Sequence, residues 1–290
     1  MRRPVLVAVL FVVAWMSTSR PAWTQTQVTS GQFETSDGVK LHYLEAGSGP
    51  LLVFVPGWTM PAEIWDPQIR HFAATHRVVA LDPRGHGRSE KPDHGYYPSR
   101  RAQDIGELLE HLGGQPAVVV SWSLGVLETL VYTQEHGTGY VRALVLVDWD
   151  LVDDEPEHFT SRFVALQVER EDWTREFVKV IFRNPPSEAY LETITLAALS
   201  VPTNATAIMI ANIILMGPNE LSAAVDALDR PALFVYSSLD WAVEASNEVL
   251  RLWPESKVEV IEETSHALFV DQPERFNQVL EEFIATLKSQ

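Results

Sequence analysis

A sharp strand-to-helix turn in the middle of the chain constrains its fold more than any other feature. The apolar run Ala117–Val120 leads into Ser121-Trp122-Ser123-Leu124-Gly125, and apolar residues at helical spacing follow. A serine at the centre of such a turn is held clear of both elements, and the residues two before and two after it must be small. Ser121 and Gly125 meet that condition. Ser123 is therefore a candidate nucleophile, although an ordinary buried strand that ends in a serine turn has the same pattern.

The composition excludes several classes of function. The 290 residues carry a formal net charge of −17 and no long basic run, so nucleic acid and anionic membrane surfaces are not expected partners. The chain has no cysteine, so no disulfide forms. No histidine or acidic spacing matches a metal site, and we expect neither a metal nor another cofactor.

The N-terminus has the pattern of a secretory signal peptide. Arg2 and Arg3 precede an uninterrupted apolar stretch from Val5 to Trp15, and a polar tract follows. The apolar stretch is short for a bilayer span. We therefore expect residues 1–24 to be removed and the mature chain to begin near Gln25. The mature protein would have no stable membrane span and would be exported to the periplasm or the medium.

Hydrophobic patterning predicts an α/β fold. A hairpin turned by Asp37-Gly38 is followed by strands that are apolar throughout and alternate with helical segments, which is typical of a mostly parallel, doubly wound sheet. The predicted strands are Gly31–Thr35, Val39–Glu45, Leu51–Val55, Val78–Leu81, Ala117–Val120, Ala143–Val147, Ala232–Tyr236 and Val258–Ile261.

One long segment interrupts the alternation. It holds only helical patterns, at Phe159–Phe182, Ser187–Leu199 and Thr203–Leu215, so residues 150–230 are predicted to form a helical cap. Residues 25–149 and 231–290 then form the core. Near the end of the core, Asp271 precedes Pro273 and Glu274, which predicts that Asp271 is the N-cap of the last helix.

Ligands of open parallel sheets bind beyond the carboxyl ends of the strands, so residues that follow strands are candidates for chemistry. Ser123, Asp240 and His266 each follow a predicted strand. They occur in the order nucleophile, acid, histidine that is typical of the α/β-hydrolases. Asp148 also follows a strand and is the alternative acid.

Nearly the whole mature chain resembles the α/β-hydrolase superfamily. The runs Pro56-Gly57-Trp58 and Gly85-His86-Gly87-Arg88-Ser89 resemble its serine esterase, perhydrolase and haloperoxidase-like branch, and Tyr236–Asp240 with Ser265-His266-Ala267 is similar to the pimeloyl-carrier-protein methyl esterases. Pro56 and Ser121 stand where the family usually has histidine and glycine. The resemblance implies a triad of Ser123, His266 and Asp240, the last preferred to Asp148 because this family keeps its acid after the penultimate strand. It also implies an oxyanion hole formed by the backbone N–H groups of Trp58 and Leu124.

The expected substrate is a small, apolar carboxylic ester, and lactone or thioester cleavage uses the same groups. Perhydrolysis and C–C bond hydrolysis would need the same triad, and a ligand receptor without activity is the alternative from another class. The oligomeric state stays open. The residues predicted to line the pocket are Trp122, Trp149, Met209, Trp241 and Leu268.

Overall fold

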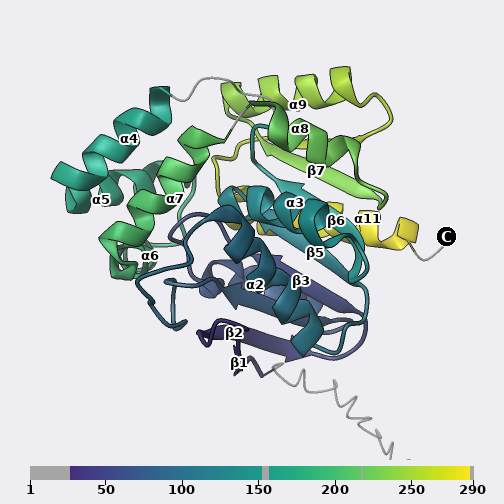
Figure 1. Ribbon diagram of the computed structural model, residues 1–290. Helices are drawn as coiled ribbons and strands as arrows, with labels where there is room; N and C mark the ends of the chain where they lie inside the picture. The colour runs from purple at the N-terminus through teal and green to yellow at the C-terminus, as the bar shows by residue number, and fades with distance from the viewer. Residues whose placement is uncertain (1–26, 152–156, 217, 288–290) are drawn as a thin grey trace, which may run out of the picture.

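An eight-stranded sheet runs through the centre of the computed structural model (Figure 1), which describes residues 27–151, 157–216 and 218–287. The predicted signal peptide lies outside the described residues. All eight predicted strands are present, with ends that differ by at most two residues. They are β1 (Thr29–Glu34), β2 (Lys40–Gly47), β3 (Leu51–Val55), β4 (Arg77–Asp82), β5 (Ala117–Trp122), β6 (Val141–Val147), β7 (Ala232–Ser237) and β8 (Lys257–Ile261).

The strands lie in the order β1-β2-β4-β3-β5-β6-β7-β8. Strand β2 is antiparallel to both of its neighbours, whereas β4, β3, β5, β6, β7 and β8 pair in parallel. The parallel strands therefore end at one edge of the sheet, where their following residues can meet.

Helices cover both faces of the sheet (Figure 1). Helices α2 and α3 lie in front of it in this view, and α11 lies behind it. The helices of the core are the 3₁₀ helix η1 (Ala62–Trp65), α1 (Asp66–Phe72), α2 (Pro98–His111), α3 (Leu124–His136), α9 (Asp240–Leu252), α10 (Leu268–Asp271) and α11 (Pro273–Leu287).

The central strands are buried on both sides because they are apolar at almost every position. All six residues of β5 are buried, as expected of a parallel strand between two helical layers. Val119 lies in a core cluster with residues of α2 and α3. Val118 and Val120 face the other way, into a second cluster with residues of α1 and α11. The predicted α/β-hydrolase fold is therefore confirmed.

Helices alone fill the described part of the segment between β6 and β7. Four of them group at one end of the sheet, at the left in Figure 1, and α8 packs against α3. Among the described residues no single helix is long and apolar enough to cross a membrane. The consecutive helices Glu188–Ser200 and Thr203–Leu215 reach that length and apolar character only when they are taken together, and they are bent by 86° relative to each other. The helices are α4 (Glu157–Val168), α5 (Arg170–Val180), α6 (Glu188–Ser200), α7 (Thr203–Leu215) and α8 (Pro218–Asp226). We call α4 to α7 the cap.

Candidate active site

Ser123 forms the sharp turn between β5 and α3. Its backbone has φ 55° and ψ −127°, a conformation that costs a non-glycine residue about 1–3 kcal/mol and is concentrated at functional sites. The turn is tight because a Cβ added to Gly125 would lie 2.8 Å from the carbonyl oxygen of Pro56. Gly125 therefore lets α3 begin directly against the loop after β3, and the predicted requirement for a small residue is confirmed.

Ser121 occupies the other small-residue position of the turn. Its side chain is fully buried, and its hydroxyl lies 2.6 Å from the hydroxyl of Thr129 on α3. A buried hydroxyl with a hydrogen-bond partner avoids the cost of desolvation. The turn therefore accommodates serine where the resemblance leads one to expect glycine.

His266 lies in the loop between β8 and α10 and faces Ser123. Its Nε2 atom is 2.9 Å from Ser123 Oγ, and its Nδ1 atom is 2.8 Å from Asp148 Oδ2. An ionised carboxylate only accepts hydrogen bonds, so the network assigns the proton of a neutral imidazole to Nδ1. Nε2 is then free to accept a hydrogen bond from the hydroxyl of Ser123.

Asp148 is fully buried and is held by the end of β7. The backbone N–H of Ser237 donates to Oδ1 over 2.6 Å, and the hydroxyl of Ser237 donates to Oδ2 over 3.1 Å. Asp148 itself has φ 53°. Trp122 pairs with Val147 in the sheet, so Ser123 and Asp148 leave neighbouring parallel strands at the same level.

The prediction that Asp240 contacts His266 is wrong, because Asp148 occupies that position. Strand β7 ends at Ser237, and Asp240 comes three residues later as the exposed first residue of α9. The residue at the end of β7 is a serine that donates to Asp148. The sequence feature that indicates Asp148 as the acid is its position directly after β6. Ser123 likewise directly follows β5.

The loop after β3 passes directly over Ser123. A Cβ added to Gly57 would lie 2.8 Å from the Cβ of Ser123 and 3.3 Å from its Oγ. Trp58 follows Gly57 in this loop, and Leu124 is the first residue of α3, where backbone N–H groups have no partner within the helix. Of the two predicted oxyanion donors, Leu124 directly follows Ser123 in the chain, and Trp58 lies in the loop whose Gly57 approaches Ser123.

We expect Gly57→Ala to lower ester turnover by about 10²-fold, the order of magnitude that a misplacement of about 1 Å can cause. The new methyl group would overlap Ser123, whose Cβ is fixed by the backbone and cannot move aside. The measurement is kcat/KM on a chromogenic ester, with Gly139→Ala as the control because nothing lies within 4 Å of a Cβ at that glycine. Equal activities of the two variants would contradict the close approach.

His86 braces the same loop. Its Nδ1 atom donates to the carbonyl oxygen of Arg84 over 2.8 Å, and its Nε2 atom accepts a hydrogen bond of 3.0 Å from the backbone N–H of Thr59. The side chain is fully buried, and burial, with a smaller effect of Arg101, holds the pKa of His86 well below its ordinary value. His86 therefore stays neutral, and its ring supports Thr59, which has a φ of 62°.

This pKa shift predicts an acid-dependent loss of stability. Below about pH 6.5, His86 takes up a proton in the unfolded chain but not in the folded one. The free energy of unfolding is therefore unaffected by His86 above that pH and decreases as the pH falls below it. One such group contributes a slope of about 1.4 kcal/mol per pH unit. Urea unfolding at pH 7.5, 6.0 and 5.0 measures it. We expect a shallower slope for His86→Gln, and equal slopes would contradict the prediction.

The predicted pocket residues fall into different surroundings. The Trp122 and Trp241 rings have their centroids 5.1 Å and 5.9 Å from that of His266. Leu268 is fully buried in the core cluster behind the sheet. Trp149 packs against Phe159 of the cap, with ring centroids 6.2 Å apart.

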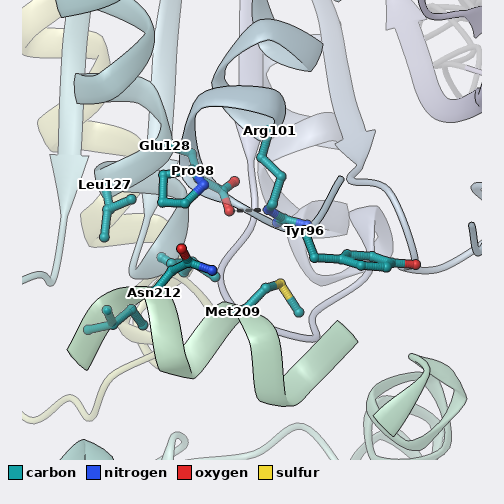
Figure 2. A pocket seen from close by; sticks show the side chains of 9 residues that line it. Tyr96, Pro98, Arg101, Leu127, Glu128, Met209 and Asn212 are labelled. Atoms are coloured by element: carbon teal, nitrogen blue, oxygen red, sulfur yellow. Dashed lines mark hydrogen bonds and ion pairs between the residues drawn. The ribbon is translucent and has the colours of Figure 1, made fainter. Parts of the chain in front are cut away.

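Met209 of α7 lines a small cavity between the cap and the core (Figure 2). Its volume is about 10 Å³, roughly the room for one water molecule. Leu124 also lines it, and a buried ion pair between Arg101 and Glu128 lies at its side. Burial raises the pKa of the Glu128 carboxyl, while Arg101 acts in the opposite direction.

Within residues 27–151, 157–216 and 218–287, no group of three or more histidine, cysteine or acidic side chains could hold a metal ion.

The fold and the geometry around Ser123 define a class of protein, the α/β-hydrolases. The alpha/beta hydrolase family model matches residues 52–279, and the chain belongs to this family.

Relatives within the family include haloperoxidases and esterases. A non-heme haloperoxidase from Rhodococcus erythropolis is 37% identical over 113 residues, which are 39% of this chain and only 41% of that relative. A pimeloyl-[acyl-carrier protein] methyl ester esterase from Vibrio cholerae is 28% identical over 261 residues, or 84% of this chain and 97% of the relative. An esterase from Exiguobacterium antarcticum has the same fold, with a TM-score of 0.81, 20% identity and coverage of 90% of this chain and 100% of that structure. The resemblance inferred from sequence is confirmed.

Proposed function

We propose that this chain is an exported serine hydrolase that cleaves a carboxylic ester through an acyl-enzyme. The observation that carries the proposal is the continuous line of hydrogen bonds from Ser123 Oγ to His266 Nε2, at 2.9 Å, and from His266 Nδ1 to Asp148 Oδ2, at 2.8 Å. A serine bonded to a base that a buried carboxylate orients is the arrangement that activates a weak nucleophile.

In the proposed reaction, Ser123 Oγ attacks the carbonyl carbon and passes its proton to His266 Nε2. His266 then gives this proton to the departing alcohol, and the acyl group stays on Ser123. A water molecule attacks the acyl-enzyme in the second half, again losing its proton to His266. Asp148 keeps the imidazole in the required tautomer and stabilises its cation.

The oxyanion of each tetrahedral intermediate would accept hydrogen bonds from the backbone N–H groups of Trp58 and Leu124. Leu124 is the first residue of α3, so the positive end of the helix dipole adds to the stabilisation of negative charge. The N-terminal position in α3 and the close approach of Gly57 to Ser123 support this assignment.

The proposed substrate is a small apolar ester. Two aromatic side chains lie near His266, the buried Trp122 and the exposed Trp241. Such surroundings favour apolar acyl or alcohol groups. Lactones and thioesters offer the same reacting carbonyl carbon.

Perhydrolysis is a second candidate, because the similarity to a haloperoxidase favours it. Hydrogen peroxide would then replace water in the attack on the acyl-enzyme, and the products would be a peracid and free Ser123. Turnover of one ester with and without peroxide, followed by an assay for peracid, separates the two activities.

Stopped-flow kinetics with a 4-nitrophenyl ester tests the proposal. We expect a burst of 4-nitrophenol equal to the amount of enzyme when deacylation is slow, followed by steady turnover. A panel of acyl lengths then defines the preferred substrate. A chain that binds these esters without turning any of them over would instead be a ligand receptor.

Export is the part of the proposal that the N-terminal pattern supports. Two arginines followed by an apolar stretch and a polar tract are typical of a cleaved signal peptide. We expect protein recovered from its source cell to lie outside the cytoplasm and to begin near Gln25. N-terminal sequencing that finds Met1 on cytoplasmic protein would refute export.

A further inference from the structure

The loop that carries His266 is bonded to the cap on both sides of the histidine. The hydroxyl of Ser265 donates to the carbonyl oxygen of Val180 over 2.6 Å. The backbone N–H of Ala267 donates to the carbonyl oxygen of Ile181 over 2.7 Å. The end of α5 and the residue that follows it thus contact the residues directly before and after His266.

Asp271 links the segment after α5 to the loop that carries His266. Its buried carboxylate accepts hydrogen bonds from the backbone N–H groups of Asn184, at 2.7 Å, and Arg183, at 2.9 Å. It also accepts one of 2.8 Å from the backbone N–H of Ser265. One side chain therefore fixes the position of the cap segment relative to the histidine loop.

The loop after β3, which contains Trp58, has its own contacts with the cap. The indole N–H of Trp58 donates to the carbonyl oxygen of Thr206 on α7 over 3.3 Å. The Trp58 ring packs edge-on against Trp173 and Phe177 of α5, with centroids 5.6 Å and 5.4 Å away. The loop after β3 and the loop that carries His266 therefore both contact the cap.

We propose that Asp271 is a positioning residue through which the cap sets the orientation of His266. This inference rests on the proposed role of His266 as the base. The cap is then part of the catalytic apparatus as well as a cover for the substrate. A shift of the cap segment displaces Ser265 and Ala267 and, with them, the imidazole between them.

The orientation of His266 matters because both ring nitrogens are engaged at short distances, with Asp148 on one side and Ser123 on the other. A catalytic group that is misplaced by about 1 Å costs about 10²-fold in rate. The indole of Trp122 holds the carbonyl oxygen of His266 over 2.8 Å. This hydrogen bond attaches the loop to β5 of the core, whereas Asp271 attaches the loop to the cap.

Asp271→Asn tests the proposal with little change in shape. The amide keeps one acceptor oxygen but turns an N–H₂ group toward a backbone N–H, so at least one of the three contacts is lost. We expect kcat to fall by about 10- to 100-fold while KM changes little. Asp172→Asn is the matched control, because Asp172 is an exposed aspartate on α5 of the cap. It should leave kcat unchanged.

Ser265→Ala provides a second variant that removes only the bond to Val180. The two changes act on one connection, so the loss in kcat of the double variant should be smaller than the product of the single losses. Each kcat is calculated from the concentration of active sites, which the size of the 4-nitrophenol burst measures. Unchanged kcat in Asp271→Asn, or losses that simply multiply, would overturn the coupling.

A spectroscopic measurement distinguishes failure of the coupling from failure of the proposed function. We expect the proton that His266 Nδ1 donates to Asp148 to give a far-downfield NMR signal, also in Ser123→Ala protein, which should not turn over. We expect Asp271→Asn in that background to shift or broaden the signal and Asp172→Asn to leave it alone. An unaltered signal in Asp271→Asn would refute the positioning role. Full activity of Ser123→Ala would refute the proposed function instead.

Discussion

Replacement of Ser123 by alanine is expected to lower ester turnover by at least about 10³-fold, because the members of a catalytic triad act as a unit. The change removes only the hydroxyl that lies 2.9 Å from His266 Nε2. Residual activity should come from the oxyanion donors and from substrate binding alone. The measurement is kcat/KM on a 4-nitrophenyl ester.

Ser121→Ala is the matched control for this experiment. Ser121 lies two residues away and is bonded to Thr129, away from His266. We expect a modest loss of stability and near-normal turnover, since a buried hydrogen bond contributes about 1 kcal/mol. Near-UV circular dichroism checks that both variants are folded. Comparable turnover in Ser123→Ala and the wild type would exclude Ser123 as the nucleophile.

Asp148→Asn is expected to lower kcat by about 10⁴-fold, the effect of the same change in a well-studied triad. The reason lies in the partners of Asp148. The backbone N–H of Ser237 keeps the amide oxygen at the Oδ1 position, so the amide N–H₂ faces His266 Nδ1. The imidazole must then carry its proton on Nε2, where it cannot accept the proton of Ser123.

Asp240→Asn makes the same chemical change at the other candidate acid. Asp240 is exposed at the start of α9, and we expect little change in kcat. Both variants should be compared at equal folded fraction, measured by thermal unfolding. The reverse order of activities would place the acid after β7 and contradict the geometry.

The sequence predicted the sheet and two of the three residues that meet at its edge. Strands that are buried on both faces are mostly apolar, so β3, β5 and β6 could be located from continuous runs of apolar residues in the sequence. The turn at Ser123 was recognisable because its small flanking residues reflect a steric requirement that glycine at position 125 meets. His266 was singled out by its position after the last strand.

The acid of the site could not be identified from the sequence. Two aspartates follow strands, and the choice depends on side-chain directions at the ends of β6 and β7 that no spacing reveals. The resemblance favoured Asp240, whereas the structure places Ser237 at the end of β7 as a donor to Asp148. Closeness to the strand end was the better guide than similarity to the family.

The link between the cap and the histidine loop also escaped prediction. The pattern around Pro273 indicated that Asp271 caps the last helix, but α11 begins at Pro273 itself and Asp271 ends α10. The carboxylate binds Arg183 and Asn184, which are nearly ninety residues away in sequence. Contacts between backbone N–H groups and a distant carboxylate leave no periodic trace in a sequence.

Capture of the acyl-enzyme tests the central claim most directly. The chain is mixed with an ester whose acyl group leaves slowly, quenched in acid, digested and analysed by mass spectrometry. We expect one acyl group per chain, attached to Ser123, and a slower loss of this group in Asp148→Asn than in Asp240→Asn. An acyl group on another residue, or steady turnover with Ser123 never modified, would contradict the account.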